Sequence, residues 1–121
     1  MTLQDIATAL VDGCRTGTET ANLDRLYASN AVSVEPLDHG NGREAHGLGA
    51  IHAKHDWWDA NFDTHATTVQ GPFLHGDDRF GVIFSADASD RQTGQRMQFT
   101  ELAIYHVTDG LITREEFFAM G

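Results

Sequence analysis

Several residue types that mark common protein classes are scarce in this sequence. It contains a single cysteine, Cys14, so no disulfide can form within the chain. No apolar run approaches the ~18 residues that indicate a membrane-spanning helix. Lysine and arginine together number 8 against 18 acidic residues, and the net charge of −10 opposes binding to nucleic acids and anionic membranes. We therefore expect neither a nucleic-acid nor a membrane partner.

The first residues also lack the features of a secretory signal peptide. No basic segment and no long apolar stretch occur there, which predicts a cytoplasmic protein. What is present is an ordinary globular composition, with 40% hydrophobic and 21% charged residues. The length of 121 residues predicts one domain, residues 1–121.

Helical periodicity is found in the first half of the sequence. Apolar residues at helical spacing predict an amphipathic helix over 3–14, with Thr2 as its N-terminal cap and Gly17 just beyond its end. A short helix around 23–27 and a third helix over about 48–62 are predicted by the same spacing. The helices therefore come early in the chain.

The remaining sequence has the alternation typical of strands. A short β-rich run at 31–36 is stopped by its proline, and the glycine-rich stretch 37–49 is predicted to be a loop. Four longer strands are predicted at about 64–75, 79–88, 95–107 and 111–119. Helices followed by consecutive hairpins predict an α+β fold: a curved antiparallel sheet wraps around three N-terminal helices and leaves a cavity near the open end of a cone.

The strand predicted over 95–107 contains an isolated acidic residue, Glu101. The residues that share its side of the strand are apolar: Met97, Phe99, Ala103, Tyr105 and Val107. A carboxylate among such neighbours is unfavourable unless it is protonated, paired or facing a solvated cavity. We therefore expect Glu101 to face a pocket. The alternative is a structural ion pair between Glu101 and Arg114 on the adjoining strand.

Three phrases carry a resemblance to a known family: WWDANF at 57–62, GPFLHGD at 71–77 and DGLITREEFF at 109–118. With the predicted order α-α-β-α-β-β-β-β, nearly the whole chain resembles the NTF2-like superfamily, and within it the SnoaL-like domain proteins. That superfamily includes ketosteroid isomerases, SnoaL polyketide cyclases, limonene epoxide hydrolases and scytalone dehydratases. The resemblance implies a homodimer formed through the convex sheet face, where Leu102 and Ile104 would provide an apolar centre.

Two positions match the pattern of the ketosteroid isomerases. Their general-base aspartate directly precedes a proline after the first strand, and Glu35-Pro36 stands in that place. Their oxyanion-binding aspartate lies on the penultimate strand, where Glu101 stands. A carboxylic acid kept protonated there can donate a hydrogen bond to a developing enolate. Leu10 stands where those enzymes have a tyrosine donor, which argues against steroid isomerisation itself.

Further candidates come from the predicted strands and helices. His65 opens the second long strand, and histidine is a common acid or base in proteins, so it is a third acid–base candidate. Glu115 and Glu116 alternate across the last strand, so one of them faces inward, and the sequence leaves open which one. The expected ligand-binding residues are Tyr27, Trp57, Phe84, Arg114 and Glu115, with core packing as the alternative for the aromatic ones.

A histidine- and aspartate-rich segment lies on the third predicted helix. His52, His55, Asp56 and Asp59 have helical spacings that could hold a metal from one face. Such a run on an amphipathic helix is more often a solvated face. We therefore expect neither a metal nor another cofactor.

The residues and the resemblance together predict cofactor-free acid–base chemistry on a small apolar or polar-aromatic molecule. Isomerisation, cyclisation, hydration and dehydration all remain open, with Glu35, Glu101 and His65 as the catalytic candidates. The alternative is a non-catalytic ligand-binding module. It is favoured if Arg114 neutralises Glu101 and no second titratable group reaches the cavity.

Overall fold

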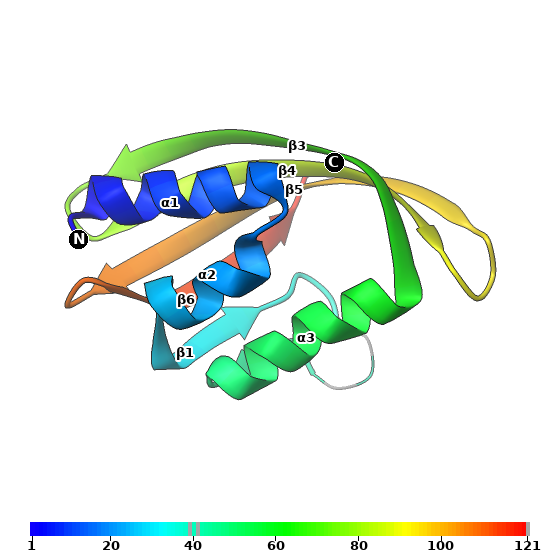
Figure 1. Ribbon diagram of the computed structural model, residues 1–121, viewed down its shortest axis with the longest axis horizontal. Helices are drawn as coiled ribbons and strands as arrows, with labels where there is room; N and C mark the ends of the chain where they lie inside the picture. The colour runs from blue at the N-terminus through cyan, green and yellow to red at the C-terminus, as the bar shows by residue number, and fades with distance from the viewer. Residues whose placement is uncertain (39, 41, 121) are drawn as a thin grey trace.

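The computed structural model describes residues 1–38, 40 and 42–120 (Figure 1). Its elements are, in chain order, α1 (Leu3–Thr16), α2 (Glu19–Leu26), β1 (Tyr27–Val34), β2 (Glu44–His46), α3 (Leu48–Asn61), β3 (Phe62–His75), β4 (Arg79–Asp90), β5 (Arg96–Thr108) and β6 (Leu111–Ala119). No helix in these residues has the length and apolar composition needed to span a bilayer.

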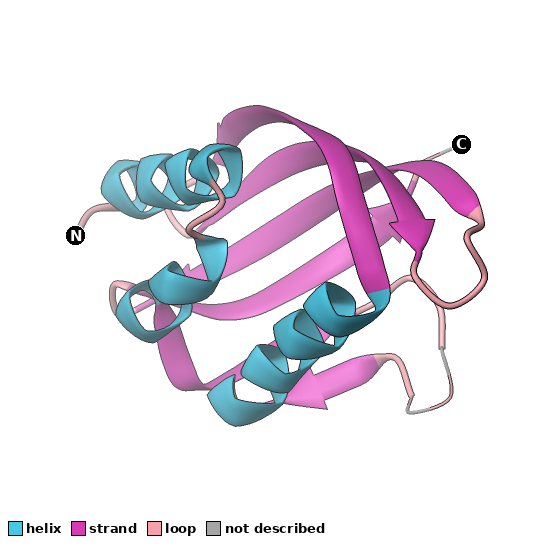
Figure 2. Ribbon diagram, turned by 45° about the vertical axis from the view of Figure 1, so that its right-hand side comes forward, coloured by secondary structure: helices cyan, strands magenta, loops and turns pink. Residues whose placement is uncertain are grey.

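The strands form one six-stranded sheet in the order β2-β1-β6-β5-β4-β3. The sheet curves around the three helices, which lie on its concave side (Figure 2). The predicted α+β architecture is confirmed, with two corrections. The sheet is mixed, because β1 pairs with β6 in parallel. In addition, residues 44–46 of the predicted loop form the edge strand β2, which pairs with residues 32–34 of β1.

The first helix follows the sequence prediction closely. The Thr2 side chain accepts a hydrogen bond from the Asp5 backbone N–H, and the Asp5 side chain accepts one from the Thr2 backbone, which is a capping box. Gly17 ends the helix with φ 75°, a conformation that glycine adopts without steric cost. The second helix differs, because Tyr27 is extended and starts β1 in place of ending α2.

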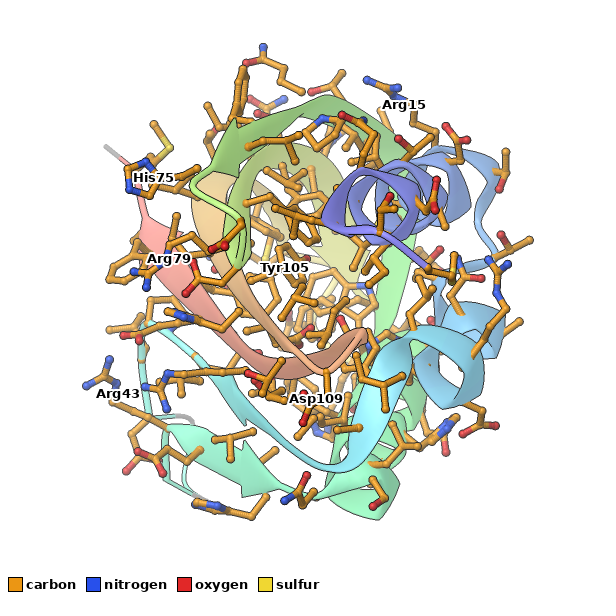
Figure 3. The ribbon with its side chains drawn as sticks, turned by 90° about the vertical axis from the view of Figure 1, so that its left-hand side faces the viewer. Arg15, Arg43, His75, Arg79, Tyr105 and Asp109 are labelled. Carbon is orange, nitrogen blue, oxygen red and sulfur yellow. The ribbon has the colours of Figure 1, made fainter. Side chains whose placement is uncertain are left out.

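The register of the strands defines two faces of the sheet. The inner face, toward the helices, carries the core residues Phe80, Val82, Ala103, Tyr105 and Ile112, which are at most 2% exposed. The rings of Phe80 and Tyr105 stack with their centroids 4.8 Å apart. Figure 3 shows Tyr105 in the interior, whereas His75 and Arg79 lie at the periphery. The outer face carries the alternate residues, among them Leu102 and Ile104.

Two register shifts interrupt β3, between Thr64 and Ala66 and between Gln70 and Phe73. The second shift contains Gly71, whose φ of 125° is a conformation that other residues rarely adopt. A Cβ atom added at this position would lie only 3.1 Å from the Gly81 carbonyl oxygen, so any other residue would be strained there. Because each shift changes which side chains face inward, residues of one parity do not share a face along the whole strand.

Candidate functional site

Glu101 lies half-buried on the inner face of β5. Its register partners are Phe84 on β4 and Ala119 on β6. Burial, together with the negative charge of Glu35, raises the pKa of the Glu101 carboxyl to about 6, while Lys54 opposes the rise. Among the described residues, Glu101 makes no hydrogen bond or ion pair. It is therefore an acid that titrates near neutral pH and is free to interact with a ligand.

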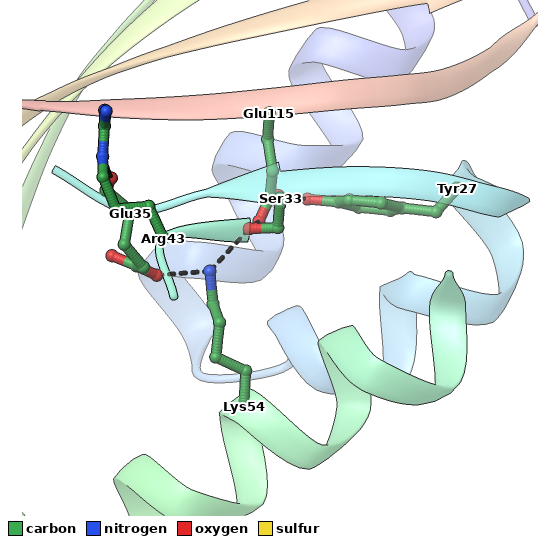
Figure 4. A network of polar contacts seen from close by, with 6 residues as sticks. All are labelled: Tyr27, Ser33, Glu35, Arg43, Lys54 and Glu115. Carbon is green, nitrogen blue, oxygen red and sulfur yellow. Dashed lines mark hydrogen bonds and ion pairs between the residues drawn. The ribbon is translucent and has the colours of Figure 1, made fainter. Parts of the chain in front are cut away.

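Lys54 of α3 holds Glu35 beside this carboxyl. Its ammonium group forms an ion pair with Glu35 Oε1 and donates a hydrogen bond to Ser33 Oγ at 2.5 Å (Figure 4). The side chains of Lys54 and Glu35 are 24% and 28% exposed, so the pair remains in contact with solvent. Two hydrogen bonds with Arg43 fix the backbone of Glu35, which accepts at 3.0 Å from the Arg43 side chain and donates at 2.7 Å to its carbonyl.

A buried carboxylate lies behind this pair. Glu115 is 3% exposed and accepts hydrogen bonds from the Tyr27 hydroxyl and, at 2.7 Å, from Ser33 Oγ. Burial and the adjacent Glu115 charge raise the pKa of Tyr27 well above its usual value, so Tyr27 remains a donor. Glu115 is thus the inward-facing member of its pair. Glu116, on the outer face, accepts from Arg114 at 3.0 Å.

The apolar surroundings of Glu101 are only partly covered. We use the term recess for the group formed by Phe84, Phe99, Glu101 and Phe117 of the inner face with Lys54 and Trp58 of α3, all of which are half-buried. The Trp58 ring stands edge-on to Phe99 with centroids 5.9 Å apart, and Lys54 Nζ lies 5.0 Å from the centre of the Phe117 ring. Inward-facing side chains nearer α1, such as Phe80, are completely buried. The core therefore ends at the recess, where solvent or a ligand can reach the inner face.

Two hollows are found on the sheet, and the first of them shares Phe99 with the recess. One, of about 510 Å³, is lined by residues 66–68, 85–87, 98–100 and 119–120. The other, of about 540 Å³, is lined by residues that include Phe73, Gly81 and Ile104 of the outer face. Glu101, Glu35 and Lys54 line neither of them. The cavity expected near Glu101 therefore corresponds to neither hollow. The recess is defined only by its partly exposed, inward-facing side chains.

Three of the predicted site residues lie apart from the recess. The first register shift of β3 places His65 next to Ser89 on the outer face, with 2.7 Å between Nε2 and Oγ, contrary to the expectation that it lines the cavity. Arg114 also lies on the outer face, so the alternative ion pair with Glu101 does not form. Trp57 is 50% exposed and contacts Phe62 edge-on at a centroid distance of 5.6 Å.

The histidines of α3 contact α2. His52 Nε2 lies 2.9 Å from Asp24 Oδ1, and His55 Nδ1 lies 2.9 Å from Thr20 Oγ1. Burial lowers the pKa of His55, which favours its neutral form. Within the described ranges, no group of three or more histidine, cysteine or acidic side chains is arranged to hold a metal ion.

Sequence reasoning missed Lys54 and Ser33. Lys54 is the only lysine in the chain, and it lies three residues after Ile51 and four before Trp58, on the apolar stripe of its helix. Ser33 lies two residues after Ala31 and two before Glu35, so strand alternation places all three on the same side. Both signals were present in the sequence, but the histidine and aspartate residues around Lys54 favoured the interpretation of this part of the helix as solvent-exposed.

Comparison with known proteins gives one family. A model of the SnoaL-like domain family matches residues 1–119. None of the curated proteins matches the chain. A solved structure from Mesorhizobium loti is described as a candidate SnoaL-like polyketide cyclase, with carbohydrate phosphatase in brackets. It is similar with a TM-score of 0.91 and 30% sequence identity, and the match covers 98% of this chain and 99% of that one.

Two more distant structures share the fold. A hypothetical protein from Catenulispora acidiphila DSM 44928 with a ketosteroid isomerase-like fold, solved in complex with trimethylamine, has a TM-score of 0.72 at 19% identity, covering 98% of this chain and 86% of that one. A candidate isomerase from Bacillus subtilis has a TM-score of 0.69 at 18% identity, covering 98% and 83%. At these identities the likeness concerns the fold alone.

Proposed function

Because the chain belongs to the family of SnoaL-like domain proteins, we propose that it binds a small, largely apolar molecule and catalyses cofactor-free acid–base chemistry on it. Its fold is the NTF2-like cone predicted from the sequence. Isomerisation, cyclisation, hydration and dehydration all proceed through proton transfers that a carboxyl group can perform. Of the two activities in the description of the Mesorhizobium loti protein, polyketide cyclase belongs to this class of reactions and carbohydrate phosphatase does not.

One observation carries the proposal: Glu101 is a half-buried, unpaired carboxyl with a pKa of about 6 among aromatic side chains. A pKa close to the working pH allows such a group both to accept and to return a proton. Glu35 is the second acid of the site, and Phe84 forms part of its apolar wall. In this proposal Tyr27 and Glu115 do not contact the ligand; they fix the position of Ser33 through hydrogen bonds to the Glu115 carboxylate.

Proton exchange tests the proposal without a known substrate. Small enolisable ketones are incubated with the protein in D₂O, and loss of their α-protons is followed by NMR. We expect exchange above the buffer rate for at least one ketone, and its loss in the double variant Glu35→Gln/Glu101→Gln. Glu44→Gln, which changes an exposed carboxylate of β2, is the matched control and should exchange as the wild type does. Exchange that is unchanged in the double variant would show that the acid–base assignment is wrong.

A non-catalytic binding module is the second candidate, and the Glu35–Lys54 ion pair favours it. Because Lys54 neutralises Glu35, a single unpaired acid faces the recess. A ligand that binds with an affinity sensitive to Glu101→Gln, combined with no proton exchange for any bound ketone, would identify this alternative.

We also propose a homodimer formed through the outer face of the sheet. Phe73 and Phe118 are 53% and 44% exposed on this face, next to Leu102 and Ile104. An apolar surface of this kind on one side of a sheet is typical of a two-fold interface. We expect Ile104→Glu to convert the dimer to a folded monomer in analytical ultracentrifugation at micromolar concentration. Thr113→Glu, on the same last hairpin, is the control, and a wild-type monomer would refute the proposal.

A further inference from the structure

The only lysine of the chain has an unused hydrogen-bond donor at the recess. An ammonium group has three N–H donors. Among the described residues, Lys54 uses one for Glu35 Oε1 and one for Ser33 Oγ. Its nitrogen also lies 5.0 Å from the centre of the Phe117 ring, on the inner face. The third donor is therefore available to a ligand that enters between α3 and the sheet.

A chain of hydrogen bonds fixes the position of this ammonium group. The single proton of the Ser33 hydroxyl is donated to Glu115, so the oxygen of Ser33 can accept from Lys54. Glu115 is in turn held by the Tyr27 hydroxyl, and Ser33 is completely buried. A lysine side chain normally loses considerable conformational entropy when it is held in one position. Here that cost is met on folding, before any ligand binds.

The charges around the recess leave Lys54 as the group suited to an anionic oxygen. The carboxyl groups near it are Glu35, Glu101 and the buried Glu115. His55, the next residue on α3, is also near, but burial lowers its pKa and favours its uncharged form. Arg43 is exposed and its guanidinium binds the Glu35 backbone, while Arg114 lies on the opposite face of the sheet. Negative charge that develops on a ligand beside Glu101 would therefore be balanced by Lys54 alone among these groups.

We propose that Lys54 binds the oxygen of an enolisable carbonyl ligand while the Glu101 carboxylate removes a proton from the adjacent carbon. The inference rests on the proposed function and adds the role of Lys54, whose ammonium group is held at the recess by Glu35 and Ser33. The C–H bond breaks, its electron pair forms a C=C bond, and the carbonyl π pair moves to the oxygen that Lys54 holds. Glu101, now protonated, returns the proton to the same or another carbon. Glu35 orients Lys54 and is not the base.

The test uses 4-nitrophenol, whose phenolate resembles an enolate in charge and absorbs visible light only when ionised. At about pH 8, where Glu101 is ionised, we expect Lys54→Met to weaken phenolate binding about 10- to 100-fold, because a charge-assisted hydrogen bond is lost. Glu101→Gln should change affinity in the opposite direction and tighten binding, because it removes a repelling charge. 4-Nitrotoluene, of similar shape and without charge, should bind all three proteins equally.

A double variant separates the specific contact from net charge. Lys54→Met alone also leaves the Glu35 carboxylate unpaired, which would repel a phenolate. Glu35→Gln/Lys54→Met keeps the net charge of the cluster unchanged, and we still expect binding at least about 10-fold weaker than in the wild type. If phenolate affinity in this variant equals that of the wild type while 4-nitrotoluene binds normally, the assignment to Lys54 is wrong and the apolar binding site stands.

A measurement on the unaltered chain covers the case in which the variants do not fold. Because the chain has one lysine, incorporation of ¹³C,¹⁵N-lysine gives a single side-chain spin system. Its Cε and Nζ resonances should shift on addition of 4-nitrophenolate and stay in place with 4-nitrotoluene. Binding of the phenolate without a shift would overturn the inference. Binding of neither probe would refute the pocket, and the proposed function with it.

Discussion

Replacing Glu101 by glutamine should lower the rate of α-proton exchange by about 10²- to 10⁴-fold, the usual contribution of a positioned general base. Glutamine has nearly the same shape but cannot accept the proton. In the wild type the rate should rise with pH and level off above about 6, because the base is active only when ionised and burial raises the pKa of Glu101 to about 6. The measurement is the exchange rate by NMR between about pH 4 and 8, and a flat wild-type profile would contradict the assignment.

The stability of the same variant shows whether any loss of exchange is due to unfolding. The folded protein binds the Glu101 proton more tightly than the unfolded chain, since the pKa rises from 4.5 to about 6. Stability should therefore fall as pH rises through this window. The shift corresponds to about 2 kcal/mol, and solvent screening of this half-exposed group reduces it to about 1 kcal/mol. Glu101→Gln should thus be more stable than the wild type above about pH 6 and similar below about pH 4, as measured by urea denaturation.

Much of the fold could be predicted because its signals are local. The capping box at Thr2 and Asp5, the glycine after α1 and the Asp109-Gly110 turn each depend on a few adjacent residues. The inward direction of Glu101 followed from strict alternation on β5, a strand whose pairing with β4 has no register shift. The family followed from the order of these elements.

What could not be predicted depends on pairing between distant segments. The shift between Thr64 and Ala66 moves His65 to the outer face, and no residue in that stretch signals a bulge. The parallel pairing of β1 with β6 brings Ser33 next to Glu115, 82 residues apart, and this contact positions Lys54. Alternation within one strand contains no information about such neighbours. The acidic residues of the site could therefore be predicted from the sequence, whereas Lys54 could not.

The two adjacent glutamates of β6 provide a matched pair of variants, because Glu115 is buried and Glu116 is partly exposed. Glu115→Ala should lower the free energy of unfolding by about 3–5 kcal/mol, because it removes a buried acceptor and leaves the Tyr27 and Ser33 hydroxyls unsatisfied. Glu116→Ala, one residue away on the outer face, loses a partly exposed ion pair with Arg114 and should cost at most about 1 kcal/mol.

Urea denaturation of both proteins at neutral pH measures the difference, since the loss of strand propensity is the same for the two substitutions. A third variant, Glu115→Gln, retains one acceptor oxygen and should have an intermediate free energy of unfolding. Its NH₂ group would face the Ser33 hydroxyl, which would then have to accept a hydrogen bond where it now donates one. The reversed hydroxyl of Ser33 could no longer accept from Lys54 in the same way, so Glu115→Gln should also shift the single lysine resonance. Equal stabilities of Glu115→Ala and Glu116→Ala would mean that the buried carboxylate does not hold the network, and Lys54 would then lack the fixed position on which its proposed role depends.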